Sequence, residues 1–448
     1  DCALGVSGLR FTYNIHGWLT EVDAVRKNGS DRTLREYTYT GDGKVETIKD
    51  YTDFLNGLTG TGKWLKRTYT YDKLNRQTGI IYTDSMSGSS TAVKQSHSYT
   101  YDKNSNITSE DVIDRYGTAN STYYGQKRDY SYDVNDRLTV SSISRRTAED
   151  AMSAAESHYY SYDAAGNKTS DVVQSQRSGF VELVSNKYYT YNEFNQLTAV
   201  DGLDMESGSL IGKTYAYDAN GNQISETDQE AGKQTVYEYD ADNRLRKATG
   251  RTGETVDYVQ ENKYNGFGQR VQKKEGSDVT AYFYDGSTVL YTEDAQDKVT
   301  SFNLIGAENN ILQTARADQD DAVNFYTYTK DLRESTINIV GADGTSQVTY
   351  DYDDYGETKT YDKDSASPFY NEVCYTAGIY DKTTGLYNLN ARYYDPENGV
   401  FMTQDTYRGS RSRTATLNLY AYCTGNPVKY TDPSGHWIWG GVGAALGA

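Results

Sequence analysis

A tyrosine-bearing segment recurs along most of this chain and constrains its fold more than any other feature. Its clearest copy is TYTYDKLNRQTG, residues 68–79. The second tyrosine of that segment has counterparts, spaced about 27 residues apart on average, at Tyr13, Tyr39, Tyr71, Tyr101, Tyr132, Tyr162, Tyr191, Tyr217, Tyr239, Tyr264 and Tyr284. A period of about 20–50 residues is typical of repeat architectures. The chain is therefore expected to use one supersecondary unit many times.

Each copy has the pattern of a β-hairpin. Two positions before the anchor tyrosine the residue is aromatic in ten of eleven copies, so both rings lie on one face of a strand. Asp or Asn follows the anchor in ten copies, and the fourth position after it is mostly a residue type that tolerates a left-handed backbone. This pattern predicts a type I turn closed by a bulge. We expect return strands to begin at Leu19, Val45, Ile107, Leu138, Leu197 and Leu245.

An isolated hairpin is marginally stable in water, so the units must join edge to edge. The sequence thus predicts an all-β fold in which the hairpins form one continuous antiparallel sheet. A net charge of −18 with few large aliphatic residues would otherwise suggest disorder. The 45 tyrosines reverse that expectation, because each ring can bury roughly 150–250 Å² while its hydroxyl keeps a polar partner.

The excess of acidic residues argues against two classes of partner. Nucleic acid needs a basic surface, and anionic membranes are disfavoured for the same reason. Cysteines and histidines are too few and too scattered to indicate a disulfide framework or a zinc site, so we expect no metal and no cofactor. These residues are Cys2, Cys374, Cys423, His16, His97, His158 and His436. Because the sequence starts at Asp1 without a signal peptide, we expect an excised or processed piece of a longer protein.

Proline divides the chain. All four prolines, at 368, 396, 427 and 433, follow residue 367, and proline would remove ladder hydrogen bonds from a sheet. We predict hairpin repeats over residues 1–300, a degenerate continuation over 301–366, a separate compact unit over 367–436, and an apolar, glycine-rich segment over 437–448.

The repeats resemble YD repeats, and the compact unit resembles the RHS repeat-associated core. The second resemblance rests on GLYNLNARYYDPENGVFMTQDTYRG, residues 385–409, followed by NLYAYCTGNPVKYTDPSGHW, residues 418–437. This family includes bacterial polymorphic toxins, C components of insecticidal toxin complexes, and teneurins. The resemblance implies that the hairpin sheet spirals into a hollow shell, capped by the core. It also implies that residues 437–448 begin a variable effector segment.

The function implied is a β-cocoon that encapsulates a C-terminal toxin and helps to deliver it. The expected partners are the chain's own toxin segment and components of a secretion system or toxin complex. The expected location is secreted or on a bacterial cell surface, in a role such as bacterial competition. The alternative is a cell-surface adhesion or carbohydrate-binding protein whose tyrosine rows stack on the sugar rings of surface glycans. That alternative predicts outward-facing aromatic patches.

The resemblance also implies self-cleavage by two aspartates of the core. The matching positions are Asp405 in MTQD and Asp432 in TDPSG, and the scissile bond would be His436–Trp437. Such chemistry needs two carboxylates close enough to share one proton. Arg392, in NARYYDP, is a candidate charge partner for either carboxylate. The structural alternatives are an ordinary turn at Asp-Pro-Ser-Gly, a cap or surface role for Asp405, and a structural salt bridge for Arg392.

Three departures from the family pattern count against self-cleavage. The usual Gly-Arg-Phe is Gly399-Val400-Phe401, the proline after the first aspartate is Thr406, and the leucine before the cut is His436. The sequence therefore leaves self-cleavage open, with any other enzymatic activity unsupported.

Other motifs favour structural interpretations. GLTGTGKW, residues 57–64, has Trp64 where a P-loop needs Ser or Thr. DANGNQISE, residues 218–226, lacks the glycine of a calcium loop and predicts another hairpin turn. DQDD, residues 318–321, is typical of a solvated acidic loop. The tail WIWGGVGAALGA has small residues four apart, at Gly443 and Gly447, as in packed transmembrane helices, but twelve residues do not span a bilayer. It opens either a membrane-active or translocation segment or the enclosed effector, and we expect the effector.

Overall fold

The structure, a computed structural model, describes residues 6–26, 30–51, 62–86, 92–116, 125–148, 151–177, 180–306, 309–317, 323–412, 414–436 and 439–440. These residues form one sheet of 29 strands, a second sheet of four strands and a two-stranded pair. Three short 3-10 helices, and no α-helix, occur in the same ranges: η1 (Tyr375–Ala377), η2 (Thr414–Leu417) and η3 (Tyr422–Gly425). The predicted all-β class is confirmed.

The large sheet takes its strands in chain order. Its first half comprises β1 (Val6–Tyr13), β2 (Leu19–Arg26), β3 (Arg32–Tyr39), β4 (Val45–Tyr51), β5 (Trp64–Tyr71), β6 (Gln77–Asp84), β7 (Val93–Tyr101), β8 (Ile107–Asp114), β9 (Gln126–Tyr132), β10 (Leu138–Ala148), β11 (Ala151–Met152), β12 (Glu156–Tyr162), β13 (Lys168–Arg177), β14 (Phe180–Tyr191) and β15 (Leu197–Asp204).

The second half comprises β16 (Ser209–Tyr217), β17 (Gln223–Asp228), β18 (Lys233–Tyr239), β19 (Leu245–Thr252), β20 (Thr255–Tyr264), β21 (Arg270–Glu275), β22 (Asp278–Asp285), β23 (Thr288–Glu293), β24 (Val299–Ile305), β25 (Ile311–Ala317), β26 (Val323–Lys330), β27 (Thr336–Gly341), β28 (Ser346–Tyr352) and β29 (Thr358–Asp362). Each strand pairs antiparallel with its neighbours in sequence, except that β10 pairs with both β9 and β12 past the short β11. The predicted return strands begin at the six residues named from the sequence.

The hairpin turns have the predicted geometry. In the turn after β5, the Asn75 amide donates to the Asp72 carbonyl (3.0 Å), and Asn75 has a φ of 67°. The Asp72 carboxylate accepts the amides of Leu74 (2.8 Å) and Arg76 (3.0 Å), which fixes the turn. A register shift at Thr70 and Tyr71 closes it with a bulge. The predicted turn and its closing bulge are thus confirmed, and they recur because each repeat carries the same local chemistry.

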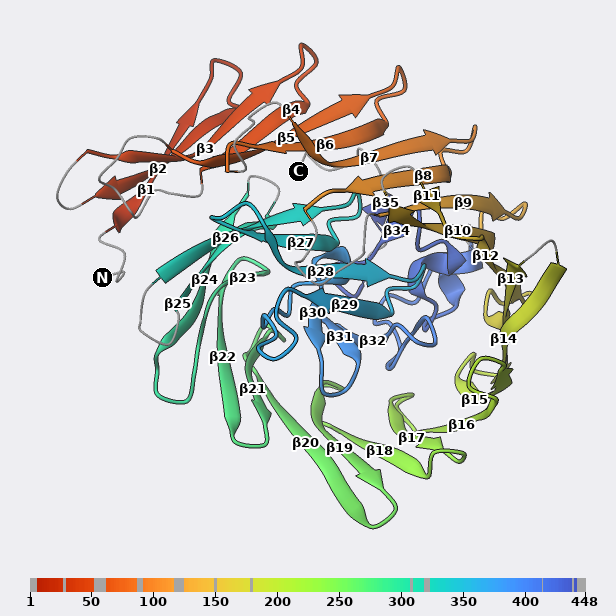
Figure 1. The fold of residues 1–448 in the computed structure, drawn as a ribbon. Helices are drawn as coiled ribbons and strands as arrows, with labels where there is room; N and C mark the ends of the chain where they lie inside the picture. Colours follow the sequence, from red (N-terminus) through yellow and green to blue (C-terminus); the bar gives the residue numbers. More distant parts are fainter. Residues whose placement is uncertain are drawn as a thin grey trace.

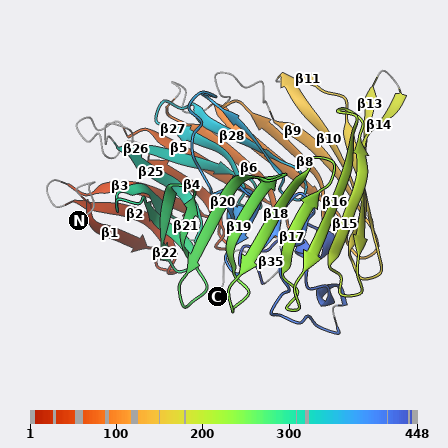
Figure 2. The same cartoon turned by 90° about the horizontal axis from the view of Figure 1, so that it is seen from below.

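The sheet winds past its own beginning. In Figure 1 the strands run from red β1 through green β20 around the outside, and the teal strands β26–β28 then lie inside β5–β9. Figure 2 shows the same stacking from below. Hydrogen bonds join the two layers: Tyr82 Oη of β6 donates to the carbonyl of Lys330 in β26 (2.8 Å), and Arg128 of β9 contacts Asp354 after β28 (3.4 Å). The predicted spiral is confirmed, and its inner end lies under its outer strands.

The main apolar core lies where the two layers meet the C-terminal unit. Contributions come from the outer layer (Leu65, Ile80, Leu138, Tyr160), the inner layer (Ile311, Tyr328, Val348) and the C-terminal unit (Tyr375, Tyr394, Tyr422). The rings of Tyr394 and Tyr422 stack at 4.2 Å between centroids. Tyrosine therefore acts as the main packing residue, as its abundance predicts.

The residues after β29 form the cap at the centre of the spiral. Its four-stranded sheet consists of β30 (Ile379–Asp381), β31 (Leu386–Leu389), β32 (Arg392–Asp395) and β33 (Val400–Phe401), and a small pair follows, β34 (Tyr430–Thr431) and β35 (Trp439–Gly440). Figure 1 shows these blue segments enclosed by the winding sheet. The cap implied by the resemblance is therefore present, and it sits against one rim of the shell.

Candidate functional site

The hairpin turns are tied to one another along a rim. Arg76 Nη1 donates to the carbonyl of Asp102 in the next turn (2.9 Å), and its guanidinium lies 4.6 Å from the Tyr101 ring centroid. Arg137 and Arg244 repeat this arrangement with their own following turns. Elsewhere an asparagine replaces the arginine, as in the bond from Asn106 Nδ2 to a turn carboxylate (2.8 Å). The rim is thus a chain of linked turns rather than a row of independent tips.

The cap binds this rim at successive turns. Asn426 Nδ2 donates to the carbonyl of Asp136 (2.6 Å), and Asn418 Nδ2 donates to Asn167 Oδ1 (2.6 Å). Tyr420 Oη donates to a turn carbonyl two repeats further on, that of Gly221 (2.8 Å). Because these contacts reach several different repeats, the cap fixes the curvature of the sheet as well as covering it.

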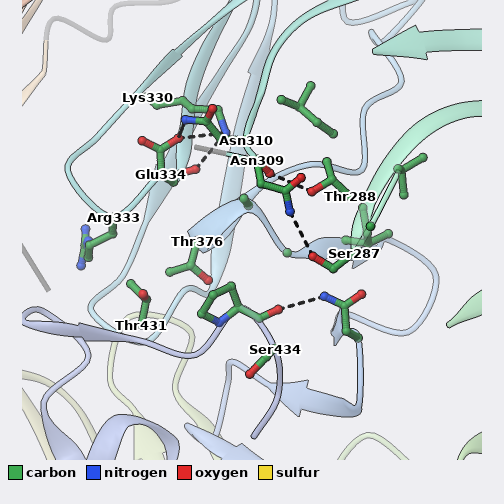
Figure 3. A pocket seen from close by; sticks show the side chains of 18 of the residues that line it. Ser287, Thr288, Asn309, Asn310, Lys330, Arg333, Glu334, Thr376, Thr431 and Ser434 are labelled. Atoms are coloured by element: carbon green, nitrogen blue, oxygen red, sulfur yellow. Dashed lines mark hydrogen bonds and ion pairs between the residues drawn. The ribbon is translucent and has the colours of Figure 1, made fainter. Parts of the chain in front are cut away.

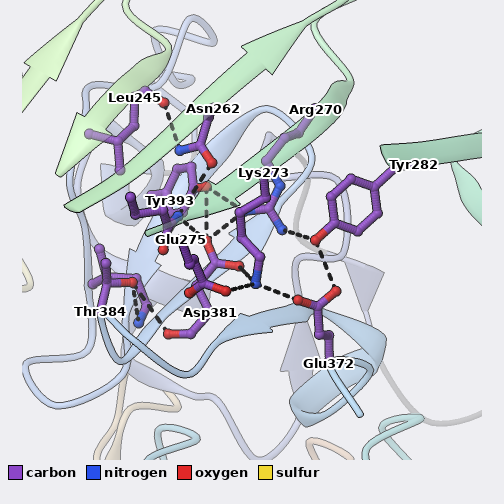
Figure 4. Close-up of polar contacts among 12 residues, drawn as sticks. Leu245, Asn262, Arg270, Lys273, Glu275, Tyr282, Glu372, Asp381, Thr384 and Tyr393 are labelled. Carbon is purple, nitrogen blue, oxygen red and sulfur yellow. Dashed lines mark hydrogen bonds and ion pairs between the residues drawn. The ribbon is translucent and has the colours of Figure 1, made fainter. Parts of the chain in front are cut away.

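A buried ion cluster joins the beginning of the cap to β21 and β22 (Figure 4). Asp381 pairs with Arg270 and lies 3.6 Å from Lys273 Nζ, which also pairs with Glu372. Tyr282 Oη donates to Glu372 (2.9 Å). Burial opposes charge on Asp381, but the attraction of Arg270 and Lys273 outweighs it, and the pKa of Asp381 is lowered. All five side chains are nearly inaccessible, so the cluster acts as a charged latch between shell and cap.

A cavity of about 1640 Å³ lies between the shell and the cap (Figure 3). Its wall combines early strands, later hairpin turns and the C-terminal part of the cap. The wall includes Arg67, Tyr82, Arg244, Lys330, Glu334, Pro433, Ser434 and His436. Pockets for small ligands measure about 300–1,000 Å³, so this one is large enough for a polypeptide segment. The last part of the cap, with Pro433, Ser434 and His436, therefore lines this cavity.

The residues predicted for self-cleavage meet at the edge of this cavity. Arg392 Nη2 lies 2.8 Å from Asp405 Oδ2 and 3.4 Å from Asp432 Oδ2, so one nitrogen bridges both carboxylates. Its guanidinium stacks 3.5 Å from the Phe401 ring centroid. Burial lowers the pKa of Arg392 from its ordinary 12.5, against the opposing effect of the two aspartates. His436 Nδ1 is 3.1 Å from Asp405 Oδ1, and the His436 amide donates to Asp432 Oδ1 (3.0 Å).

The segment before the predicted scissile bond is held residue by residue. Three consecutive residues of the cap bind three consecutive carbonyls: Asn390 Nδ2 to Pro433 (3.0 Å), Ala391 N to Ser434 (3.2 Å) and Arg392 Nε to Gly435. Gly435 has a φ of +72°, and a Cβ there would lie 2.6 Å from the Leu389 carbonyl. Only glycine fits this approach, which explains the glycine of Asp-Pro-Ser-Gly.

The remaining motifs are placed as follows. Trp64 begins β5, and residues 57–61 of the P-loop-like segment lie outside the described residues. Gly221 donates to the Asp218 carbonyl (3.1 Å), so residues 218–221 form the predicted hairpin turn. Residues 318–321, Trp437 and residues 441–448, with Gly443 and Gly447, also lie outside the described part. Within it, no group of three His, Cys, Asp or Glu side chains is placed to hold a metal, and no helix is long and apolar enough to cross a bilayer.

A family model described as Teneurin YD-shell matches residues 86–428, well over half of the chain. The chain belongs to the Teneurin YD-shell family. The match starts within the repeats and ends in the cap, so it covers both parts of the fold.

The chain is similar in sequence to two nucleases and in fold to a solved structure. The tRNA3(Ser)-specific nuclease WapA of Bacillus spizizenii is 36% identical over 292 residues, 64% of this chain and 11% of that protein. The tRNA nuclease WapA of Bacillus subtilis (strain 168) is 35% identical over 292 residues, with the same coverage of both chains. The crystal structure of TcdB2-TccC3 without hypervariable C-terminal region superimposes with a TM-score of 0.70 at 18% identity, over 95% of this chain and 20% of that one. The chain thus spans about a tenth of the curated relatives' length.

Sequence reasoning missed the residues that link the turns of the rim and those that attach the cap to the shell. The rim residues Arg76, Asn106, Arg137 and Asn167 all stand five positions after an anchor tyrosine, so the repeat alignment itself carried that signal. No local sequence pattern indicates the latch, because Arg270 is 111 residues from its partner Asp381. No sequence pattern predicts that residues 433–435 bind residues 390–392, apart from the glycine at position 435.

Proposed function

We propose that this chain is the wall and cap of a shell that encloses an effector segment beginning after His436. The observation that carries the proposal is the attachment of the cap to the rim at successive turns, through Asn418, Tyr420 and Asn426. Such contacts close one end of a spiral that would otherwise be open. The proposed role of this chain is therefore containment, and any toxic activity belongs to the enclosed effector segment.

The cavity beside the C-terminal part of the cap supports this role. Pro433, Ser434 and His436 form part of its wall, so the chain reaches the predicted effector boundary at the cavity. The lining mixes tyrosine rings with charged and polar groups, which offers a passenger both apolar area and hydrogen bonds. A wall of this kind retains an unfolded segment without one dominant tight site.

The relatives support a toxin setting. Their names describe nucleases acting on tRNA, and a further similar structure, with a TM-score of 0.66, is that of a Photorhabdus luminescens Tc holotoxin pore. We infer that this chain is secreted or displayed at a bacterial surface. We also infer that it works together with components of a secretion system or toxin complex. In eight of the eleven copies the tyrosine two positions before the anchor is buried, as at Tyr99 and Tyr130, which counts against rows of rings that stack on glycans.

Two measurements on the chain with its natural C-terminal extension test containment. An electron-microscopy map should show an enclosed interior that holds the extension, and a map without one would overturn the proposal. Nitration by tetranitromethane should reach exposed tyrosines such as Tyr159 and Tyr188 while sparing Tyr99 and Tyr130. Rapid nitration of all rings, together with binding to a glycan panel, would favour adhesion instead.

We further propose that Asp405 and Asp432 hydrolyse the bond between His436 and Trp437. The support is their shared contact with Arg392 and the fixed position of the segment that leads to the bond. One water would be consumed: its oxygen joins the carbonyl carbon of His436, the carbon–nitrogen bond breaks, and the leaving nitrogen of Trp437 takes a proton. One carboxylate removes a proton from the water, and the other, when protonated, supplies the proton.

Mass spectrometry of the extended chain tests this step. Wild type is expected to yield a fragment ending at His436, whereas Asp405→Asn and Asp432→Asn stay intact. Asp343→Asn is the matched control, because Asp343 is an exposed aspartate far along the chain from the site, and it should cleave as wild type does. Identical masses for wild type and both site variants would overturn self-cleavage and leave containment standing.

A further inference from the structure

The imidazole of His436 contacts the carboxylate proposed to cut beside it. His436 Nδ1 lies 3.1 Å from Asp405 Oδ1, and Thr406 Oγ1 lies 3.4 Å from the same nitrogen. An ionised carboxylate only accepts hydrogen bonds, so when Asp405 is ionised, Nδ1 is the donor in this contact. The side chain of the residue to be cut is thus bound to a member of the aspartate pair.

The other contacts of Asp405 leave little capacity for water. Oδ1 also accepts the amide of Tyr407 (2.9 Å), and Oδ2 accepts Arg392 Nη2 (2.8 Å). A carboxylate oxygen has about two lone-pair positions, so His436 and Tyr407 together occupy those of Oδ1. Asp405 Oδ1 is thus engaged as an acceptor by the side chain of His436 and the amide of Tyr407.

We propose that His436 restrains the hydrolysis of its own peptide bond by occupying Asp405 Oδ1, where an attacking water would otherwise be held. His436 is then a positioning residue whose side-chain donor sets the rate. The inference rests on the proposed self-cleavage. The His436 side chain is 32% exposed and lines the cavity, so it can move away from Asp405 without unfolding the cap.

Two substitutions separate a hydrogen bond from mere bulk. His436→Leu removes the donor, whereas His436→Asn keeps one, since its amide nitrogen takes the place of Nδ1. With the naturally extended chain, His436→Leu should release the C-terminal fragment about tenfold faster than wild type or more, because a hydrogen bond to a charged group is lost. His436→Asn should remain as slow as wild type. The double variant Asp405→Asn with His436→Leu should stay intact.

Several outcomes would overturn the restraint. If His436→Leu is cleaved no faster than wild type, His436 does not restrain cleavage. If His436→Asn is cleaved as fast as His436→Leu, the hydrogen-bond donor is not the cause of the restraint. If no variant is cut between pH 4 and 8, the restraint and self-cleavage fall together, and containment is still decided by the electron-microscopy map. Equal thermal unfolding midpoints for all variants establish that each rate refers to a folded cap.

Discussion

The hydroxyl of Tyr132 donates a 2.6 Å hydrogen bond to the carbonyl oxygen of Ile107, the residue that begins the return strand of the preceding hairpin. The same bond joins other neighbouring repeats, as from Tyr162 to Leu138 (2.8 Å) and from Tyr191 to Lys168 (2.9 Å). Nine of the eleven anchor tyrosines fasten their own hairpin to the one before it by such a bond. This explains why the hydroxyl, and not just the ring, recurs.

Tyr132→Phe should lower the free energy of unfolding by about 0.5–1.5 kcal/mol, the net worth of one intramolecular hydrogen bond. Urea denaturation followed by tyrosine fluorescence measures the change. Tyr188→Phe is the matched control, because Tyr188 is 52% exposed, and it should change stability by less than about 0.5 kcal/mol. Equal losses in the two variants would show that the shared bond contributes nothing.

The hairpins could be predicted from the sequence because their determinants are local. A turn at Asp72–Asn75 needs only an aspartate at its start and a residue that tolerates positive φ at its end. The repeat period then fixes which strands are neighbours. Fold class, strand starts and turn type all follow from residues within one repeat.

The stacking of the inner layer on the outer one could not be predicted in this way. Tyr82 and Lys330 are separated by 248 residues, so no pattern within one repeat links them. The candidate site is intermediate: family resemblance named Asp405, Asp432 and Arg392, and the structure brings them together. The contact of His436 with Asp405 depends on how the cap folds back, which no local pattern encodes.

Asp381→Asn should open the latch between cap and shell. Removing one partner of a buried ion pair leaves Arg270 and Lys273 without compensation, and such losses cost about 3–5 kcal/mol. Limited proteolysis should then cut between β29 and β30 at a concentration of protease that leaves wild type intact. Asp343→Asn, which breaks an exposed pair with Lys363, should cost about 1 kcal/mol or less and leave proteolysis unchanged.

Asp395→Asn should alter the pH dependence of stability. Burial, with the nearby carboxylates of Glu226 and Glu397, raises the pKa of Asp395 from 3.8 to about 7. Ionisation is therefore more costly in the folded chain than in the unfolded one, so the contribution of Asp395 to stability is greatest at low pH and falls as pH rises from about 4 to 7. Asparagine does not ionise, so the variant loses no stability at this position as the pH rises.

The measurement is the difference in unfolding free energy between Asp395→Asn and wild type, taken at pH 5 and at pH 8. The difference should move in favour of the variant by on the order of 2 kcal/mol as pH rises. Any fixed cost of altering the bond from Asn398 Nδ2 to this side chain cancels in the comparison. A difference that stays constant with pH would contradict the raised pKa.

Gly435→Ala should dislodge the segment that leads to the predicted scissile bond. A non-glycine residue at positive φ costs about 1–3 kcal/mol, and the added Cβ would also meet the carbonyl of Leu389 at 2.6 Å. The expected results are faster proteolysis around residues 433–436 and no fragment ending at His436. Gly385→Ala is a close control, since Gly385 has a φ of +74° with open space around its Cβ position. Gly385→Ala introduces the same backbone strain without the clash. Loss of cleavage in both variants would therefore show that backbone strain, and not displacement of residues 433–435, is the cause.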